Sequence, residues 1–162
     1  MVQFLATDGG YRASTNIGAW AFVVEGDISI VDFGAEEGTT NQKMELKAII
    51  EALKYAKNNF PNEEIGILSD SAYCVNGMNQ RWFDKWILNR WLNSKNEPVK
   101  NKELWQELIE LDKELNVKYV KVLGHSGDEL NELADLEVNR AMDEYIEKKE
   151  TENGDLERDR WI

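Results

Sequence analysis

The chain opens with an apolar run that closes on an acid, Val2-Gln3-Phe4-Leu5-Ala6-Thr7-Asp8. A second run of the same form follows much later, Ile65-Gly66-Ile67-Leu68-Ser69-Asp70. Short apolar runs of this kind predict buried β-strands. In open sheets of parallel strands, ligand sites collect at the carboxyl ends of the strands. If the two runs are neighbouring parallel strands, Asp8 and Asp70 therefore emerge together at one end of a sheet.

Two further acids, Glu45 and Asp135, lie near the starts of helix-like runs. Taken alone, each of the four acids has a structural interpretation. Asp8 suits a turn, and Asp70 suits the N-cap of the helix that follows it. Glu45 and Asp135 are favoured electrostatically near helix N-termini. Four acids that the predicted layout brings together favour instead a shared site for a hard cation, which prefers oxygen ligands.

The rest of the sequence alternates between strand-like and helical patterns. Strands are predicted at 2–7, 19–25, 28–33, 65–68 and 117–123, and helices at 41–57, 71–77, 81–92, 101–115 and 131–148. We expect residues 8–16 to form a polar loop and Gly77 to end the second helix. Strands followed by alternating helices and strands predict an α/β fold, with a mixed sheet flanked by helices.

Composition limits the class of protein. At 162 residues, a single domain over 1–147 is expected, and the charged tail over 148–162 either extends the last helix or frays. The single cysteine, Cys74, excludes an internal disulfide and fits a reducing compartment. No basic and apolar leader is visible, and no run approaches the roughly 20 apolar residues of a membrane span. We therefore expect a cytoplasmic monomer without a membrane partner.

Charge is distributed unevenly along the chain. The whole sequence carries a net charge of −12, yet residues 80–102 hold six basic residues against two acids. Trp82, Trp86 and Trp91 are interleaved with these cations. One interpretation is a basic handle for a sugar–phosphate backbone, because local potential decides where a polyanion binds. The other is an amphipathic helix whose tryptophans belong to the core. The sequence leaves both interpretations open.

Several motifs together resemble type 1 ribonuclease H, in register from about residue 3 to residue 145. They are TDG at 7–9, GAW at 18–20, TTNQKMEL at 39–46, SDSAY at 69–73, PVKNKELW at 98–105, VLGHSG at 122–127 and NELAD at 131–135. The resemblance implies a five-stranded mixed sheet with helices on both faces. It also implies a metal-dependent endonuclease that hydrolyses the RNA strand of RNA–DNA hybrids, using magnesium or manganese.

The same resemblance implies roles for individual residues. Asp8, Glu45, Asp70 and Asp135 fall on the family's four metal-binding carboxylates, and His125 falls on its mobile catalytic histidine. Two ions per site are implied, with Asp8 between them. Glu45 and Asp70 then share the first ion, and Asp135 helps to hold the second. A lone histidine is usually structural, but an ordinary pKa near 6.5 suits His125 to proton transfer.

Contacts with nucleic acid also follow from the match. Thr40, Asn41 and Gln42 fall on the segment that contacts the minor groove, where 2′-hydroxyls distinguish RNA from DNA. Asn41 is alternatively a helix N-cap. The further contacts implied are a DNA-strand phosphate at Thr40 and Asn101, a deoxyribose along Trp82, and the basic handle at Arg81 and Lys85.

One loop departs from the family pattern. Residues 10–17 replace the family's glycine- and proline-rich loop, so no RNA contact is assigned there. Two other functions also remain open: a related nuclease that acts on DNA, and a non-catalytic module that binds hybrids. Four intact acids argue against the second, because converging carboxylates repel one another without a metal.

Overall fold

The computed structural model describes residues 2–27, 30–123 and 129–160, with side chains up to residue 154. Its sheet has five strands in the order β3-β2-β1-β4-β5. They are β1 (Val2–Arg12), β2 (Ile17–Val24), β3 (Val31–Glu37), β4 (Glu64–Ser69) and β5 (Asn116–Lys121). Strands β1, β2 and β3 pair antiparallel, whereas β4 pairs parallel with both β1 and β5. The predicted five-stranded mixed sheet is confirmed.

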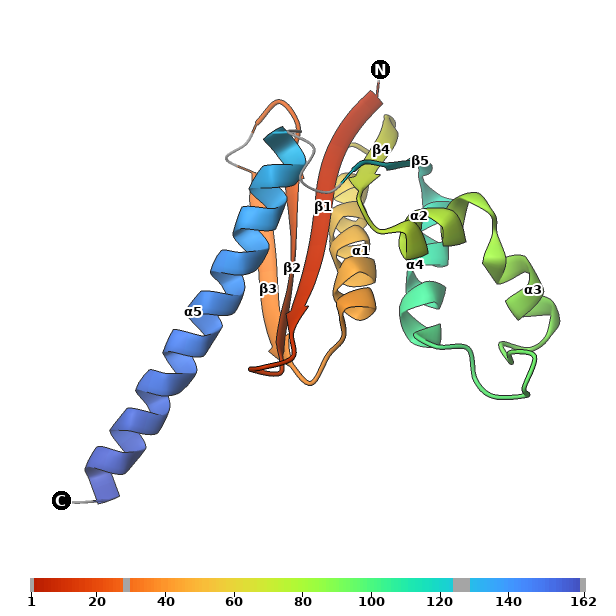
Figure 1. The fold of residues 1–162 in the computed structure, drawn as a ribbon. Helices are drawn as coiled ribbons and strands as arrows, with labels where there is room; N and C mark the ends of the chain where they lie inside the picture. The colour runs from red at the N-terminus through yellow and green to blue at the C-terminus, as the bar shows by residue number, and fades with distance from the viewer. Residues whose placement is uncertain (1, 28–29, 124–128, 161–162) are drawn as a thin grey trace.

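Helices cover both faces of this sheet (Figure 1). They are α1 (Asn41–Asn59), α2 (Ala72–Asn79), α3 (Trp82–Leu88), α4 (Lys102–Glu114) and α5 (Glu129–Arg160). Helix α1 packs on β1 and β2 and is itself covered by α4, while α5 crosses the opposite face over β1, β2 and β3. Within the described residues, no helix is both long and apolar enough to cross a membrane.

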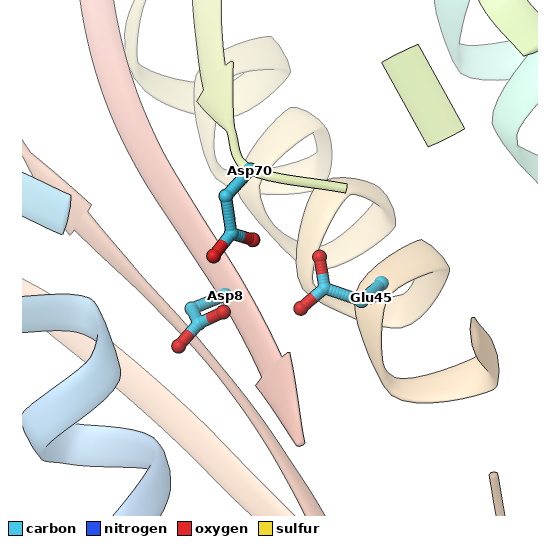
Figure 2. A group of neighbouring side chains, drawn as sticks. All are labelled: Asp8, Glu45 and Asp70. Carbon is cyan, nitrogen blue, oxygen red and sulfur yellow. The ribbon is translucent and has the colours of Figure 1, made fainter. Parts of the chain in front are cut away.

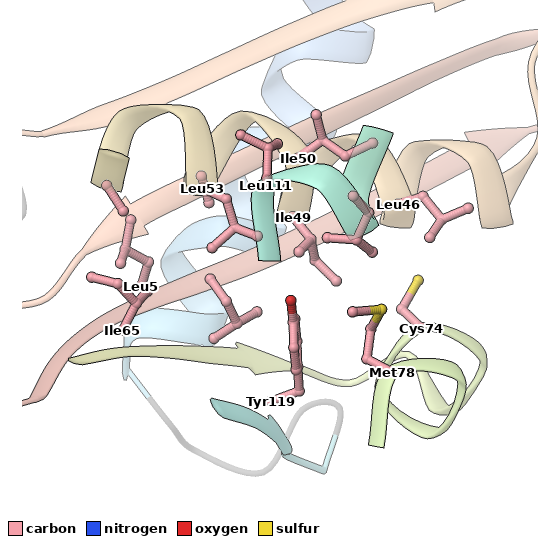
Figure 3. Close-up of a cluster of buried hydrophobic side chains, with 14 of the residues drawn as sticks. Leu5, Leu46, Ile49, Ile50, Leu53, Ile65, Cys74, Met78, Leu111 and Tyr119 are labelled. Carbon is pink, nitrogen blue, oxygen red and sulfur yellow. The ribbon is translucent and has the colours of Figure 1, made fainter. Parts of the chain in front are cut away.

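The main core lies between α1, the sheet and α4 (Figure 3). The apolar stripe predicted on α1 is buried there, as Leu46, Ile49 and Leu53 are fully covered. A smaller core fills the space between α5 and β2, where Ala19 and Ala21 leave room for helix side chains such as Val138. Helices α1 and α5 contact β1 from opposite faces, and β1 carries the first candidate acid.

Several element boundaries differ from the sequence prediction. Strand β3 does not end at Phe33 but continues to Glu37, because its pairing with β2 runs on to Ile17 opposite Glu37. Strand β1 does not end at Asp8 but continues to Arg12, because its antiparallel pairing with β2 runs on to Arg12 and Ile17. Helix α2 does not stop at Gly77 but passes through it to Asn79. A Cβ at Gly77 would lie only 2.3 Å from Cη2 of Trp105. This glycine therefore makes room for a buried ring and does not end the helix.

The basic segment and the C-terminal segment also differ from expectation. Helix α3 ends at Leu88 and does not reach residue 92, because Arg90 and Trp91 adopt positive φ angles that a helix cannot accommodate. Helix α5 is longer than predicted and runs to Arg160, so the expected tail continues as helix over 148–160. Pairing of Lys149 with Glu37 ties the first turn of this extension to β3.

Candidate metal centre

Asp8 in β1 and Asp70, the first residue after β4, hold equivalent places beside two neighbouring parallel strands. The pairing of β1 with β4 ends at Ala6 opposite Leu68, and each acid lies two residues beyond that pair. Side chains alternate along a strand, so both acids lie on the same face as the pair that precedes them. Figure 2 shows their carboxylates facing a common space. The predicted adjacency of the two strands is confirmed.

Glu45 enters this space from the second turn of α1. The helix is capped by Thr40, whose side chain accepts a hydrogen bond from the Lys43 amide at 3.1 Å. The amide of Gly9 donates to Oε1 of Glu45 at 2.6 Å. A Cβ at Gly9 would lie 2.4 Å from the backbone nitrogen of Glu45, so only glycine lets β1 pass so close to α1. This close passage orients the Glu45 carboxylate.

The three acids form a compact group of oxygens. One carboxylate oxygen from each of Asp8, Glu45 and Asp70 lies within 4.8 Å of the others. Asp135, in the second turn of α5, is close enough to Asp8 for a side-chain hydrogen bond. All four predicted acids line one cleft with a volume of about 600 Å³. The fold thus brings together carboxylates from two strands and two helices.

The electrostatics of the group favour a bound cation. Burial, with further repulsion from Asp70 and Asp135, raises the pKa of Asp8 to about 7. Burial and the charge of Asp8 raise the pKa of Glu45 well above its ordinary value. Oε2 of Glu45 is buried, and no described residue gives it a hydrogen bond. A divalent cation would supply the missing partner and offset the repulsion, so these residues are consistent with divalent metal binding.

The residues predicted to contact nucleic acid near the acids lie partly on the same cleft. Asn41 and Gln42 line it beside Glu45. Thr40 is the N-cap of α1, so the alternative that Asn41 is the cap is wrong. Ser71 caps α2, which likewise removes that structural role from Asp70. His125 lies outside the described residues.

Asn101 and Trp82 lie beyond the rim of the cleft, on either side of Tyr73. The Tyr73 hydroxyl accepts hydrogen bonds from Nδ2 of Asn101 at 3.2 Å and from Nε1 of Trp105 at 2.8 Å. Oδ1 of Asn101 is buried without a hydrogen bond from any described residue. The Trp82 ring meets Tyr73 edge-on, with centroids 6.0 Å apart. Tyr73 thus links the cleft to both predicted contacts.

The structure decides one of the two interpretations of the basic segment, the packing of its tryptophans, and leaves binding of a sugar–phosphate backbone a prediction. Trp82, Trp86 and Trp91 pack against the main core, which confirms the structural interpretation for the tryptophans. Arg81 is exposed, but its guanidinium pairs with Asp84 at 2.9 Å. Lys85 is exposed on α3. The cations therefore face solvent while the rings between them are held by the core.

Tyr73 and Arg12 are among the residues that line the cleft but were not predicted as site residues. Tyr73 follows Asp70 by three residues, and its place in the first turn of a helix after a strand end was the available signal. Arg12 was missed because residues 8–16 were expected to form a loop. Once β1 is seen to continue, alternation places Arg12 on the same face as Asp8.

Comparisons with known proteins agree with this arrangement. Residues 2–143 match the family model described as RNase H. Ribonuclease H from Caldicellulosiruptor saccharolyticus is 47% identical over 137 residues, covering 84% of this chain and 92% of that protein. Ribonuclease H from Clostridium botulinum (strain Hall) is 43% identical over 143 residues, covering 86% of this chain and 94% of that protein.

A solved structure gives the same result. The crystal structure of LC9-RNase H1, a type 1 RNase H with the type 2 active-site motif, superposes with a TM-score of 0.71. It is 25% identical in sequence, and the match covers 87% of this chain and 72% of that one. Family model, sequence relatives and fold agree over most of the chain. The chain therefore belongs to the RNase H family.

Proposed function

We propose that this protein is a metal-dependent endonuclease that hydrolyses the RNA strand of RNA–DNA hybrids. The observation that carries the proposal is the group of three acids, with oxygens within 4.8 Å of one another, at the cleft of an RNase H family chain. The products carry 5′-phosphate and 3′-hydroxyl ends, because water attacks the phosphorus and the neighbouring 2′-hydroxyl does not.

The four acids would hold two divalent cations, magnesium or manganese. When bound, such a pair activates water and stabilises the leaving oxygen of an in-line displacement. Asp8 lies between Asp135 on α5 and the other two acids, which suits it to contact both cations. Glu45 and Asp70 complete the first position, and Asp135 completes the second. His125 moves a proton or assists product release.

Selection of the hybrid falls to the rim of the cleft. Asn41 and Gln42 read 2′-hydroxyls of the RNA strand in the minor groove. Thr40 and Asn101 precede the first turns of α1 and α4, and helix N-termini favour phosphates of the DNA strand. Trp82 lies along a deoxyribose. Exposed cations of α3 and its flank, including Arg81 and Lys85, add binding affinity that does not depend on the base sequence.

Cleavage of three matched duplexes tests the proposal: an RNA–DNA hybrid, duplex DNA and duplex RNA. Only the RNA strand of the hybrid should be cut in magnesium, and chelator should remove all activity. Asp70→Asn should abolish cleavage but preserve hybrid binding, because it weakens a metal ligand and relieves repulsion of the substrate. Asp32→Asn, an exposed acid outside the cleft, is the matched control and should retain full activity.

Two outcomes would contradict the proposal. Cyclic phosphate ends would show that the 2′-hydroxyl attacks, which excludes hydrolysis directed by two metals. Tight hybrid binding without cleavage in magnesium or manganese would identify a non-catalytic binding module. His125→Ala should slow cleavage without removing it, because water can replace a proton shuttle, and steady-state kinetics distinguish partial from complete loss.

A further inference from the structure

One cation lies at the far end of the cleft that holds the acids. Side chains alternate along β1, so Asp8, Gly10 and Arg12 share one face. That face is the one that α5 covers, because a Cβ at Gly10 would lie 3.1 Å from Cγ1 of Val138. Gly10 has no side chain, so Val138 and Met142 of α5 pack closely over β1 at this point, and Asp8 and Arg12 line the same cleft on either side of it along the strand.

Helix α5 packs along the same stretch of β1. Asp8 faces Asp135 at one end, and Arg12 pairs with Asp143 at the other. Four strand residues span about 13 Å and eight helix residues span about 12 Å. Strand β1 and helix α5 therefore contact each other at both ends of this stretch, through carboxylates at one end and through the Arg12 guanidinium at the other.

Arg12 is held in place but is not saturated with partners. Its Nη1 donates to Oδ1 of Asp143 at 2.6 Å, and its Nη2 donates to Oδ1 of Asn139 at 3.0 Å. A guanidinium has five N–H donors, so three remain for another acceptor. The Arg12 side chain is 31% exposed, and among the described residues that line the cleft Arg12 is the only cation.

A purely structural role explains this residue less well. As a fastener of α5, the Arg12–Asp143 pair is weak, because the Asp143 side chain is 67% exposed and exposed ion pairs contribute little. A guanidinium matches the geometry of a phosphate, and an ion pair with an exposed carboxylate yields readily to a second anion. The acid group and this guanidinium line the same cleft.

We infer that Arg12 binds a phosphate of the RNA strand flanking the scissile bond, and so fixes the register of that strand over the metal centre. The inference rests on the proposed function and deepens it. The roughly 13 Å along β1 from Asp8 to Arg12 places the guanidinium away from the acids, so the phosphate that it binds flanks the scissile one. Arg12 acts by binding and takes no part in bond breaking.

Single-turnover cleavage of the hybrid tests the inference. Arg12→Gln should raise the half-saturating enzyme concentration about tenfold, as expected for loss of one charge-assisted contact, and leave the saturated rate within about twofold. Arg12→Lys should restore most of the affinity. Arg140→Gln is the matched control: it removes the same charge from an exposed α5 arginine outside the cleft, and should change neither parameter.

Uncharged methylphosphonates, placed one at a time at 2′-deoxy positions flanking the cut, locate the contact. With the wild-type enzyme, a methylphosphonate at one position of the RNA strand should raise the half-saturating enzyme concentration about tenfold. With Arg12→Gln, the same replacement should raise that concentration no further. Asp143→Asn should keep the wild-type pattern, because it frees the guanidinium without removing it. Thermal unfolding of each variant shows whether α5 stays docked.

Several results would overturn the inference. If Asp143→Asn reproduces the defect of Arg12→Gln, Arg12 merely fastens α5. If every methylphosphonate effect adds to that of Arg12→Gln, or if the coupled position lies on the DNA strand, Arg12 does not bind the RNA strand. If the wild-type enzyme cleaves the hybrid and any of these results is found, the inference about Arg12 is wrong but the proposed function stands. A wild type that cleaves no hybrid removes the proposed function, and the inference falls with it.

Discussion

Replacement of Gly9 by alanine is the sharpest test of how the metal centre is built. The added Cβ would lie 2.4 Å from the Glu45 nitrogen and from the Met44 carbonyl carbon. Both are backbone atoms, so no side-chain rotation relieves the overlap. Because carbon contacts are optimal at about 3.5–4.0 Å, the start of α1 must move away from β1 by about 1 Å.

The cost of this movement follows from the contacts it disturbs. Overpacking of a tight site costs roughly 1–3 kcal/mol, and we expect Gly9→Ala to lie at the upper end, about 3 kcal/mol. For a chain of this size, that loss lowers the melting temperature by roughly 6–12 °C. The displaced Glu45 also loses the amide of Gly9. A misplacement of about 1 Å near a reacting centre can cost about 10²-fold in rate.

Gly10→Ala, on the next residue of the strand, is the matched control. Its Cβ would meet only side-chain atoms of Val138 and Met142, at 3.1 and 3.6 Å, and these can shift. We expect its melting temperature to fall by a few degrees at most. Thermal unfolding and calorimetric titration with magnesium compare the two variants. Equal stability and equal metal affinity in both would refute the reasoning from close approach.

Three other predictions concern parts of the fold outside the cleft. Gly77→Ala should lower stability by about 2 kcal/mol in denaturant unfolding, because the buried Trp105 ring leaves no space for a methyl group. Burial raises the pKa of Asp112 in the folded protein above its ordinary value. At a pH above this raised pKa, the buried carboxylate is charged and destabilises the folded state. At a pH below the ordinary pKa, the group is neutral in both states and has no such effect. Asp112→Asn, which still accepts the Tyr119 hydrogen bond, should therefore raise the melting temperature at pH 7 more than at pH 3. Removal of residues 148–162 should leave hybrid cleavage intact and shift the melting temperature by only a few degrees, because the described apolar contacts of α5 end before that segment.

The strand pair that carries Asp8 and Asp70 was predictable because its signal is local. Each run is apolar, short and closed by an acid, and rules for parallel sheets place such acids together. The same holds for α1, whose stripe of apolar residues has helical spacing. Where a short window of sequence contains the whole physical cause, the prediction was confirmed.

The differences arise where the cause lies far away along the chain. Residues 9–12 begin with two glycines, a composition typical of loops, and pairing with β2 keeps them extended as far as Arg12. Gly77 has the composition of a helix stop, yet Trp105 decides its role. Tyr73 gains its place through hydrogen bonds from α4. Such contacts depend on tertiary packing, which a single sequence does not display.

Side chains alternate between the two faces along β1, so the position of the acid in the active site depends on the register of the sheet. If β1 slipped by one residue, every side chain would change face. Asp8 would then turn toward the start of α1, at the point where the backbone leaves room for glycine alone. A molecule with β1 in the shifted register could not pack α1 against the sheet, and its main core would not form. Steric exclusion therefore couples correct folding to assembly of the carboxylates, and a population of folded molecules should contain no stable fraction that lacks the metal centre.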